Sequence, residues 1–431
     1  MLLKILIILI LIVNTAFAEL VIDVQGVSKP TPIAIVPFGM EINSSKTPFD
    51  ITQVIKDDLT RSGRFAPISE NDMLQKPTDG KDVYFDDWSI LGVEAILVGK
   101  LTQKEDLDAY TLQFQLFDTF RRQQLIGFRM TLNSKTYRAA AHRAADIVYE
   151  ELTGIKGIFS TKVAYVTAQE KNNKLLYSLF ISDQDGENSI KIMNSVHPIM
   201  SPTWSPDSRQ LAYVSFEGSK SSIFIQTLRT GNRFKVSDEP GINGAPSFSP
   251  DGRKLVVTLG GVNGNLDIYI LDIATKESNR LTNHRAIDTE GVWSPDGKYI
   301  YFTSDRSGSP QIYKIPSIGG SPERITFEGK YNARPRLSPD GSKLAMVHND
   351  NGKYRIAVMN IKQEGLLVLS SGTQDESPSF APNSDVLIYA TRKDNYGVLE
   401  TVSSNGLIRQ TMVSGEGGDI REPVWSPFSK F

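Results

Sequence analysis

Trp204-Ser205-Pro206-Asp207 is the first copy of a short phrase that occurs six times along the chain. The other copies are Phe248-Ser249-Pro250-Asp251, Trp293-Ser294-Pro295-Asp296, Leu337-Ser338-Pro339-Asp340, Phe380-Ala381-Pro382-Asn383 and Trp425-Ser426-Pro427-Phe428. Successive prolines of these phrases lie 44, 45, 44, 43 and 45 residues apart. That spacing is typical of β-propeller blades with four strands each. The repeat therefore predicts a propeller.

Each phrase has the composition of a type I turn. Pro stands at the second corner of every copy and Ser at the first corner of five, and Gly252, Gly297 and Gly341 occupy the fourth corner of three copies. Short apolar or β-branched runs separated by Gly, Asn and Lys lie between the phrases. We expect each unit to be one inner strand that ends at the Pro corner, followed by three strands further out.

The number of strands predicts how the ring closes. Three strands precede the first phrase without an inner strand of their own, at 162–167, 175–182 and 187–193. The C-terminal run 420–425 fits that vacancy, with Val424 and Trp425 expected beside Ala164 and Tyr165. We therefore predict a mainly β protein with a six-bladed propeller closed by its C-terminal strand, which leaves few exposed sheet edges.

The N-terminal 18 residues have the composition of a secretory signal peptide. Lys4 precedes an apolar run from Ile5 to Val13, and Ala16-Phe17-Ala18 is a small-residue cleavage pattern. Cleavage after Ala18 would leave a soluble periplasmic protein that is not inserted in a membrane. The alternative is that the segment is retained as an anchor.

Residues 31–156 lack the repeat and predict a small α/β domain ahead of the propeller at 160–431. Asp50 stands where a helix N-cap would, and a second helix face runs from Tyr137 to Leu152 before Gly154. Alternating strands around residues 110–132 predict a hairpin. We expect a small sheet covered by two helices, held at a fairly fixed angle to the ring by the short joint 157–160.

Composition excludes several kinds of partner and site. The 47 Lys and Arg residues nearly balance the 49 Asp and Glu residues, so nucleic acid is not an expected partner. The chain has no Cys, and its four His residues do not have the spacing of a metal motif. We expect no cofactor and no metal, with His142 on a solvated helix face.

Motifs for catalysis are equally scarce. No Gly-x-Ser-x-Gly elbow occurs. Asp183-Gln184-Asp185-Gly186 resembles the start of a calcium loop, but the twelfth position is Asn194 instead of Glu, which favours a plain turn. A periplasmic propeller hydrolase acting on glycan or peptide is the alternative function. It would depend on carboxylates at the channel mouth, namely Asp288, Glu290, Asp375, Glu376 and Glu422.

Charged residues gather where the inner strands begin. Five residues before each Pro stand Ser201, Ala245, Glu290, Arg334, Ser377 and Glu422, with Asp288, Thr289, Arg336, Asp375, Glu376 and Arg421 nearby. Strand packing would prefer apolar residues at these positions. A concave mouth of mixed charge suits a protein partner, and a merely solvated channel mouth is the alternative.

The signal peptide, small α/β domain and six repeats in this order resemble the TolB family of the Tol-Pal system. The resemblance covers essentially the whole mature chain. It implies a non-enzymatic, monomeric periplasmic adaptor that binds the lipoprotein Pal and the protein TolA and supports outer-membrane invagination during cell division and envelope integrity.

The resemblance also implies which residues bind. Asn243-Gly244-Ala245-Pro246 and Thr289-Glu290 match the family's Pal-facing motifs, while Ile242 stands where the family often has His. The expected Pal face comprises Ile242, Asn243, Ala245, Thr289, Glu290, Arg334, Glu376 and Glu422. The expected TolA segment is 19–30, with Glu19, Leu20, Val21, Ile22, Asp23 and Val24. An ordinary edge strand is the alternative for this segment.

Overall fold

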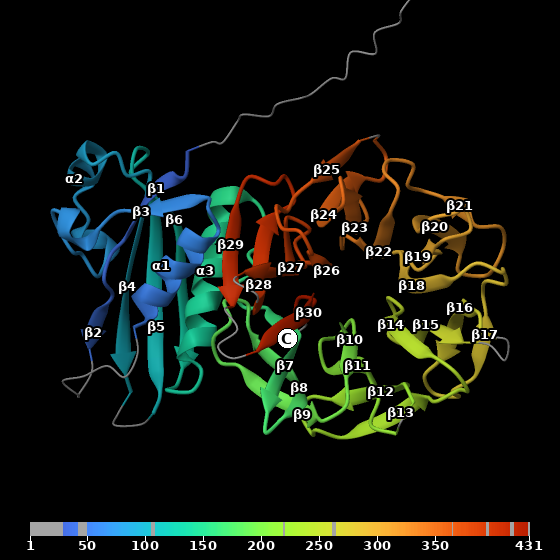
Figure 1. The fold of residues 1–431 in the computed structure, drawn as a ribbon. Coiled ribbons are helices and arrows are strands. Elements are labelled where there is room, and N and C mark those ends of the chain that lie inside the picture. Colours follow the sequence, from blue (N-terminus) through green and yellow to red (C-terminus); the bar gives the residue numbers. More distant parts are fainter. Residues whose placement is uncertain are drawn as a thin grey trace, which may run out of the picture.

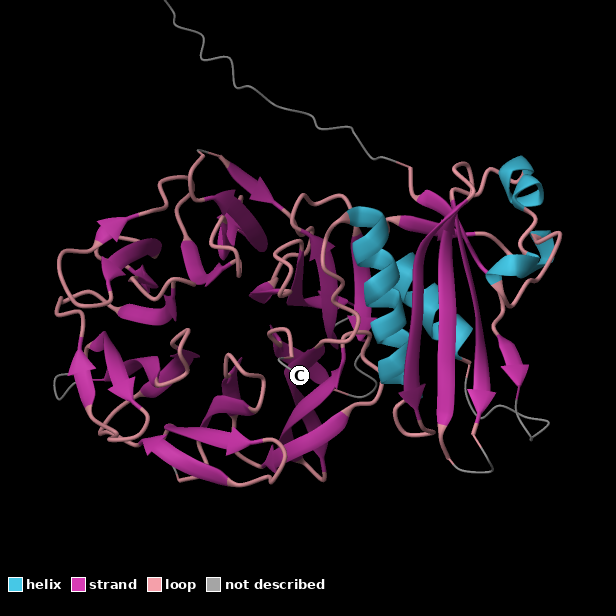
Figure 2. Ribbon diagram, turned by 180° about the vertical axis from the view of Figure 1, so that it is seen from behind, coloured by secondary structure: helices cyan, strands magenta, loops and turns pink. Residues whose placement is uncertain are grey.

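The protein has two domains side by side, an α/β sandwich and a ring of β-sheets (Figures 1 and 2). This computed structural model describes residues 29–41, 50–104, 108–218, 220–260, 264–363, 365–393, 396–413 and 418–429. The predicted signal peptide, its cleavage site at Ala18 and the stretch from Glu19 to Val24 lie outside the described residues. Within the described ranges, no helix is long and apolar enough to cross a membrane.

The N-terminal domain is a twisted sheet with the strand order β3-β1-β4-β5-β6, and β2 pairs with β4. Its strands are β1 (Thr31–Ile35), β2 (Gly39–Glu41), β3 (Phe65–Pro67), β4 (Ala95–Gln103), β5 (Tyr110–Asp118) and β6 (Gln123–Leu132). Its helices are α1 (Ile51–Arg61), α2 (Phe85–Ile90) and α3 (Tyr137–Thr153), with 3-10 turns at Glu70–Asp72 and Gly80–Asp82.

Alternation along the strands gives this sheet two apolar faces. On β1, Ile33 and Ile35 pack in the cluster that contains α1 and α3, whereas Ala34 packs in a second cluster with Trp88 of α2. The predicted cap is confirmed, since Asp50 accepts a hydrogen bond of 2.9 Å from the backbone N–H of Gln53. The expectation of two helices is incomplete, because α2 is too short to show a helical period in the sequence.

Six four-stranded sheets form the ring. They are β10 (Ile199–Trp204), β11 (Gln210–Ser215), β12 (Ser222–Thr227), β13 (Arg233–Ser237); β14 (Asn243–Phe248), β15 (Lys254–Gly260), β16 (Leu266–Asp272), β17 (Ser278–Arg280); β18 (Asp288–Trp293), β19 (Tyr299–Ser304), β20 (Gln311–Pro316), β21 (Glu323–Arg324). The rest are β22 (Asn332–Leu337), β23 (Lys343–Asp350), β24 (Lys353–Asn360), β25 (Leu366–Val368); β26 (Glu376–Phe380), β27 (Val386–Lys393), β28 (Tyr396–Ser403), β29 (Arg409–Val413); and β30 (Asp419–Trp425) with β7 (Lys162–Lys171), β8 (Lys174–Asp183) and β9 (Ile190–Ser195).

The first five phrases form the predicted corners between first and second strands, whereas the sixth follows β30, whose partner β7 lies far back in the chain. In one copy, the N–H of Gly297 donates to the carbonyl of Ser294 at 2.9 Å, and Gly297 has a φ of 72°. The Ser294 hydroxyl donates to Asp296 at 2.6 Å and accepts from the N–H of Tyr299 at 2.9 Å. Ser and Asp therefore satisfy the corner's polar groups from within the phrase.

The last strand of the chain completes the first blade, as predicted. β30 pairs with β7 in antiparallel fashion, with Val424 opposite Ala164. Trp425 lies opposite Val163, not Tyr165, because an antiparallel partner runs backwards along β7. Trp425 is 4% exposed, and its indole N–H donates to the Thr161 hydroxyl at 2.8 Å.

A buried ionic cluster joins the two domains where α1 and α3 meet the β8–β9 turn. The expectation of a solvated His142 is wrong: its side chain is 2% exposed, and Nδ1 lies 2.6 Å from Asp58. Asp185 accepts from Arg138 at 2.5 Å and from Arg61 at 3.2 Å. The turn that resembles a calcium loop is thus a plain turn whose carboxylates face arginines.

Hydrogen bonds also hold the linker 157–160 between the two domains in place. Asp146 of α3 accepts from the backbone N–H of Phe159 at 2.7 Å and of Ser160 at 3.2 Å. On the other side of the contact, Arg64 pairs with Asp385 at 3.3 Å. These contacts restrict rotation of one domain against the other.

His142 makes the junction sensitive to pH. Burial lowers the pKa of His142, but its neighbours Asp183 and Asp58 outweigh burial and raise the pKa to about 9. Nε2 of His142 lies 3.7 Å from Asp183, which is an ion-pair distance rather than a hydrogen bond. Burial also raises the pKa of Asp183, yet His142 and Lys162 hold it well below its ordinary value.

We expect the His142 contribution to stability to be lost in alkali. A pKa raised from 6.5 to about 9 stabilises the fold fully below pH 6.5 and loses this stabilisation as pH rises through about 9. The loss should be about 3 kcal/mol. Urea unfolding followed across this range should show the slope in the parent protein, while His142→Gln abolishes it and His197→Gln leaves it unchanged. A slope that persists in His142→Gln would contradict this assignment.

Candidate interaction site at the mouth of the ring

All six inner strands contain one residue in the left-handed conformation at the same place in the repeat. These residues are Ser201 (φ 51°), Ala245 (45°), Glu290 (58°), Arg334 (56°), Ser377 (54°) and Glu422 (50°). None is Gly, and the next residue is Pro in every blade except at Gly291. The strand pairing is interrupted by a β-bulge at this point in each blade.

The bulges concentrate backbone strain on one ring of residues. A non-Gly residue in this conformation costs of the order of 1–2 kcal/mol. Pro202 and its counterparts cannot donate a ladder hydrogen bond, so they suit a bulge better than a regular strand. Six repeats of the same strained geometry give the inner strands one common shape at the mouth of the ring.

In every blade, the residue two positions before the left-handed one has a buried side chain that supports the mouth of the ring. Ile199 and Ile420 occupy this position in two blades, and polar residues occupy it in the others: Asn243, Asp288, Asn332 and Asp375. Asp288 accepts two hydrogen bonds from Arg306, at 2.9 and 2.7 Å. The carboxamide of Asn243 accepts from Ser237 at 2.6 Å and donates to the carbonyl of Glu239 at 2.8 Å.

These contacts correct part of the sequence interpretation. Asp288 and Asp375 are 0% and 1% exposed, so packing does require polar groups at these positions. Asn243 is also fully buried and shapes the loop that carries Ile242. Of the five carboxylates on which a hydrolase would depend, Asp288 and Asp375 are therefore structural, and Glu290 is ion-paired.

Arg334 is the central charge of the mouth. Its Nε donates to Glu290 at 3.0 Å, its backbone N–H donates to the same carboxylate at 3.0 Å, and its guanidinium contacts the Ser377 hydroxyl. Glu376 lies 3.8 Å from it. Burial lowers the pKa of Arg334, but these carboxylates, above all Glu290, outweigh it and raise the pKa overall.

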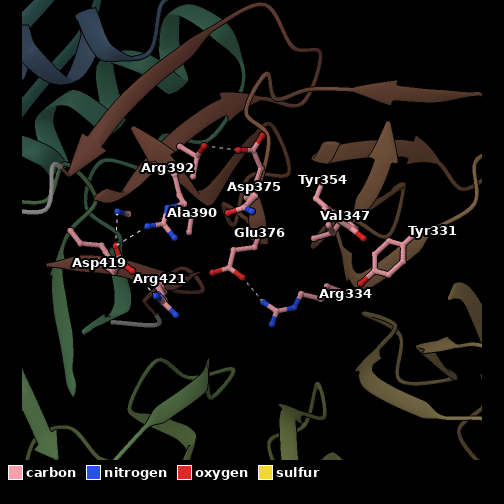
Figure 3. Close-up of a pocket in the computed structure, with 14 residues that line it drawn as sticks. Tyr331, Arg334, Val347, Tyr354, Asp375, Glu376, Ala390, Arg392, Asp419 and Arg421 are labelled. Carbon is pink, nitrogen blue, oxygen red and sulfur yellow. Dashed lines mark hydrogen bonds and ion pairs between the residues drawn. The ribbon is translucent and has the colours of Figure 1, made fainter. Parts of the chain in front are cut away.

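A cavity of about 410 Å³ opens on the mouth between the blades of β22, β26 and β30 (Figure 3). Arg421 pairs with Asp419 at 2.5 Å on one wall, and the rings of Tyr331 and Tyr354 meet edge to face at 5.2 Å on another. Glu376 and Arg334 lie between these walls. The cavity thus offers both signs of charge beside aromatic surface.

A second cavity of about 440 Å³ follows the channel axis and is lined by all six inner strands. Most of the predicted Pal-face residues line it: Ile242, Asn243, Ala245, Thr289, Glu290, Arg334 and Glu422. Glu376 lines only the first cavity, and Arg334 lines both. The structure therefore brings the predicted face together, while the predicted TolA segment lies outside the described residues except at its end.

Sequence reasoning named Ile242 but missed the rest of the apolar part of the mouth. Ile242 is 52% exposed, and Ile287 occupies the same place in the next blade with 47% exposed. Tyr354 and Tyr396 expose 40% and 54% on the blades of β24 and β28. An isoleucine directly before the polar residue of the inner strand is the sequence signal that could have revealed Ile287. Exposed apolar residues beside charges are typical of protein interfaces.

One group of described residues could hold a metal ion by geometry alone, namely Asp58, His142 and Asp185. This group belongs to the domain junction and not to the mouth. Arg61 contacts both of its carboxylates, at 2.7 and 3.2 Å. Cations of the chain thus already occupy the positions around these oxygens, which fits an ionic joint better than a metal centre.

Comparisons with known proteins cover the whole architecture. Residues 20–125 match the TolB amino-terminal domain, and residues 149–429 match the TolB beta propeller domain. The Tol-Pal system protein TolB of Xanthomonas oryzae pv. oryzae is 43% identical over 412 residues, which cover 95% of this chain and 93% of the relative. The crystal structure of TolB from Acinetobacter baumannii has 40% identity and a TM-score of 0.85, covering 92% of this chain and 97% of that one.

The strained ring gives a direct prediction for stability. Ala245→Gly should raise the free energy of unfolding by about 0.5–1 kcal/mol, because relief of the left-handed strain exceeds the entropy cost of Gly. Ala333→Gly, at a buried strand position that is not left-handed, should lower it by a similar amount. Guanidinium unfolding of both variants provides the measurement. A destabilised Ala245→Gly would show that the bulge is not strained.

Proposed function

Because the chain belongs to the TolB family of the Tol-Pal system, we propose that it is a periplasmic, monomeric adaptor that binds Pal and TolA and catalyses no reaction. Its work would support outer-membrane invagination during cell division and envelope integrity. The observation that carries the proposal is the mouth of the ring, where exposed isoleucines and tyrosines surround paired charges on a strained, six-strand frame. A rigid concave surface of this kind favours a folded protein partner.

Two features support Pal as the partner of the mouth. The predicted Pal-face residues line two adjoining cavities, and Arg334 borders both. Exposed Ile242 and Ile287 can bury apolar area, while Glu376 and Arg421 at 42% and 50% side-chain exposure can pair with charges of a partner. Asn243 would contribute through the loop it supports and not by direct contact.

The N-terminal segment supports TolA as a second partner at a separate place. Val21, Ile22 and Val24 give the segment the β-branched content of a strand that can add to the edge of a foreign sheet. The segment precedes β1 in the sequence, and β1 belongs to the N-terminal domain and not to the ring (Figure 1). A signal peptide ahead of it supports a periplasmic location.

Ile242→Asp should weaken Pal binding at least tenfold, because a carboxylate would have to be buried where an apolar side chain fits. Ile318→Asp is the matched control, since Ile318 is 97% exposed in the turn between β20 and β21. Calorimetric titration with Pal is the measurement, with thermal unfolding as a check on the fold. Glu290 is a poorer probe, because reversing its charge would break the pair with Arg334. Equal affinities of both variants would contradict the assignment of the mouth.

Truncation separates the two partners. The mature chain from Glu19 should capture both Pal and TolA, whereas a chain beginning at Thr31 should capture Pal alone, because the mouth is intact and the segment is gone. Pull-downs with each purified partner provide the measurement. Equal capture of TolA by both chains would refute the role of the segment without affecting that of the mouth.

A further inference from the structure

The channel cavity is lined by four charged side chains, and two of them form no ion pair with the described residues. Glu290 and Arg334 neutralise each other by direct contact at 3.0 Å. Arg336 and Glu422 also line the cavity. Among the described residues, no ion pair is formed by either of these two side chains. They come from β22 and β30, whose blades are separated by the blade of β26–β29.

Arg336 uses little of its hydrogen-bonding capacity. One terminal nitrogen donates to the backbone carbonyl of Pro335 at 2.9 Å, and its five N–H groups make no other bond to the residues that the structure describes. Burial lowers the pKa of Arg336 below its ordinary value, although Glu290 opposes the effect. The guanidinium of this half-buried residue thus has no partner among the described residues that matches its planar fork.

Glu422 has the opposite charge and likewise forms no ion pair with the described residues. It stands on β30 and lines the same cavity. One of its oxygens accepts a hydrogen bond from the backbone N–H of Ser201, and no further donor to the carboxylate is found in the described part of the chain. Burial raises the pKa of Glu422, with Arg334 opposing. An unpaired carboxylate is costly in a confined channel, just as the unpaired guanidinium is.

The two leftover charges have opposite signs, so the cavity has no excess of either. A lone anion bound at Arg336 would be repelled by Glu422, and a lone cation at Glu422 would be repelled by Arg336. A ligand that carries both charges would compensate both side chains at once. Hydroxyls of Thr203 and Ser247 border the same cavity and could bond such a ligand further.

We propose that the channel binds a small zwitterion of the amino-acid class, with its carboxylate on Arg336 and its ammonium group on Glu422. The cavity volume of about 440 Å³ accommodates such a molecule. This site goes beyond the adaptor function, since it lies inside the ring and needs no partner protein. The same two charges could also arrive on a segment of a bound protein.

Calorimetric titration of the mature chain with glycine, β-alanine and γ-aminobutyrate at low ionic strength tests the proposal. At least one of these ligands should bind saturably, and the length that binds best reports the separation of the two charges. The capped forms of that ligand, N-acetylated or amidated, should bind at least tenfold more weakly because each lacks one charge. These ligand-side controls do not depend on the folding of any variant.

Arg336→Gln and Glu422→Gln should each weaken binding at least tenfold, whereas Arg253→Gln, an exposed corner residue, should not. Absence of saturable binding to all three ligands, or unchanged affinity in both Gln variants, would overturn the proposal. Titration with Pal in the presence of the ligand then distinguishes the sources. Competition would indicate that a segment of Pal uses the same charges, and independent binding would indicate a free ligand. Failure of Pal to bind at all would affect only the adaptor function.

Discussion

The pairing of β30 with β7 is the constraint on which the ring depends. Without it, the blade of β7–β9 would lack an inner strand and the channel would lack one of its six walls. The same strand carries Glu422 at the mouth and Trp425 at the domain junction, where the indole contacts Thr161. One ladder of hydrogen bonds thus fixes the channel, part of the mouth and the edge against which the N-terminal domain rests.

Rigidity is the common property of the mouth and the junction. At the mouth, buried anchors such as Asp288 and a ring of left-handed residues hold the inner strands in one shape. At the junction, His142, Asp58 and Asp185 are fixed among arginines, and Asp146 pins the linker. A stiff surface loses little conformational entropy on binding, which favours recognition of a folded partner. Burying so many charges costs stability, and it is tolerated only because nearly all of them are paired.

The periodicity of the sequence made the fold predictable. The burial of side chains by segments that are distant in the sequence could not be predicted in this way. Two observations were enough to predict six blades and their closure. They are the spacing of the prolines and the three strands at 162–193 that have no inner strand of their own next to them in the sequence. His142 was misplaced because it lies beside the apolar face of α3, and the residues that contact it, Asp58 of α1 and Asp183 at the end of β8, come from distant parts of the sequence. Asp288 and Asp375 were taken as surface charges because nothing local shows that Arg306 or Ser370 lies against them. The left-handed residues had one signal, the Pro that follows five of them, and it was not used.

The bond between Thr161 and Trp425 joins residues 264 positions apart. A ribosome produces the chain from its N-terminus, so the blade of β7–β9 lacks its inner strand until the other five blades and then β30 have been made. Closure is therefore a late step with a large loss of loop entropy, and such contacts form slowly. A chain that stops before β30 would expose the edge of β7 and become prone to aggregation. The pairing of β7 with β30 therefore forms only when every blade of the ring has been made.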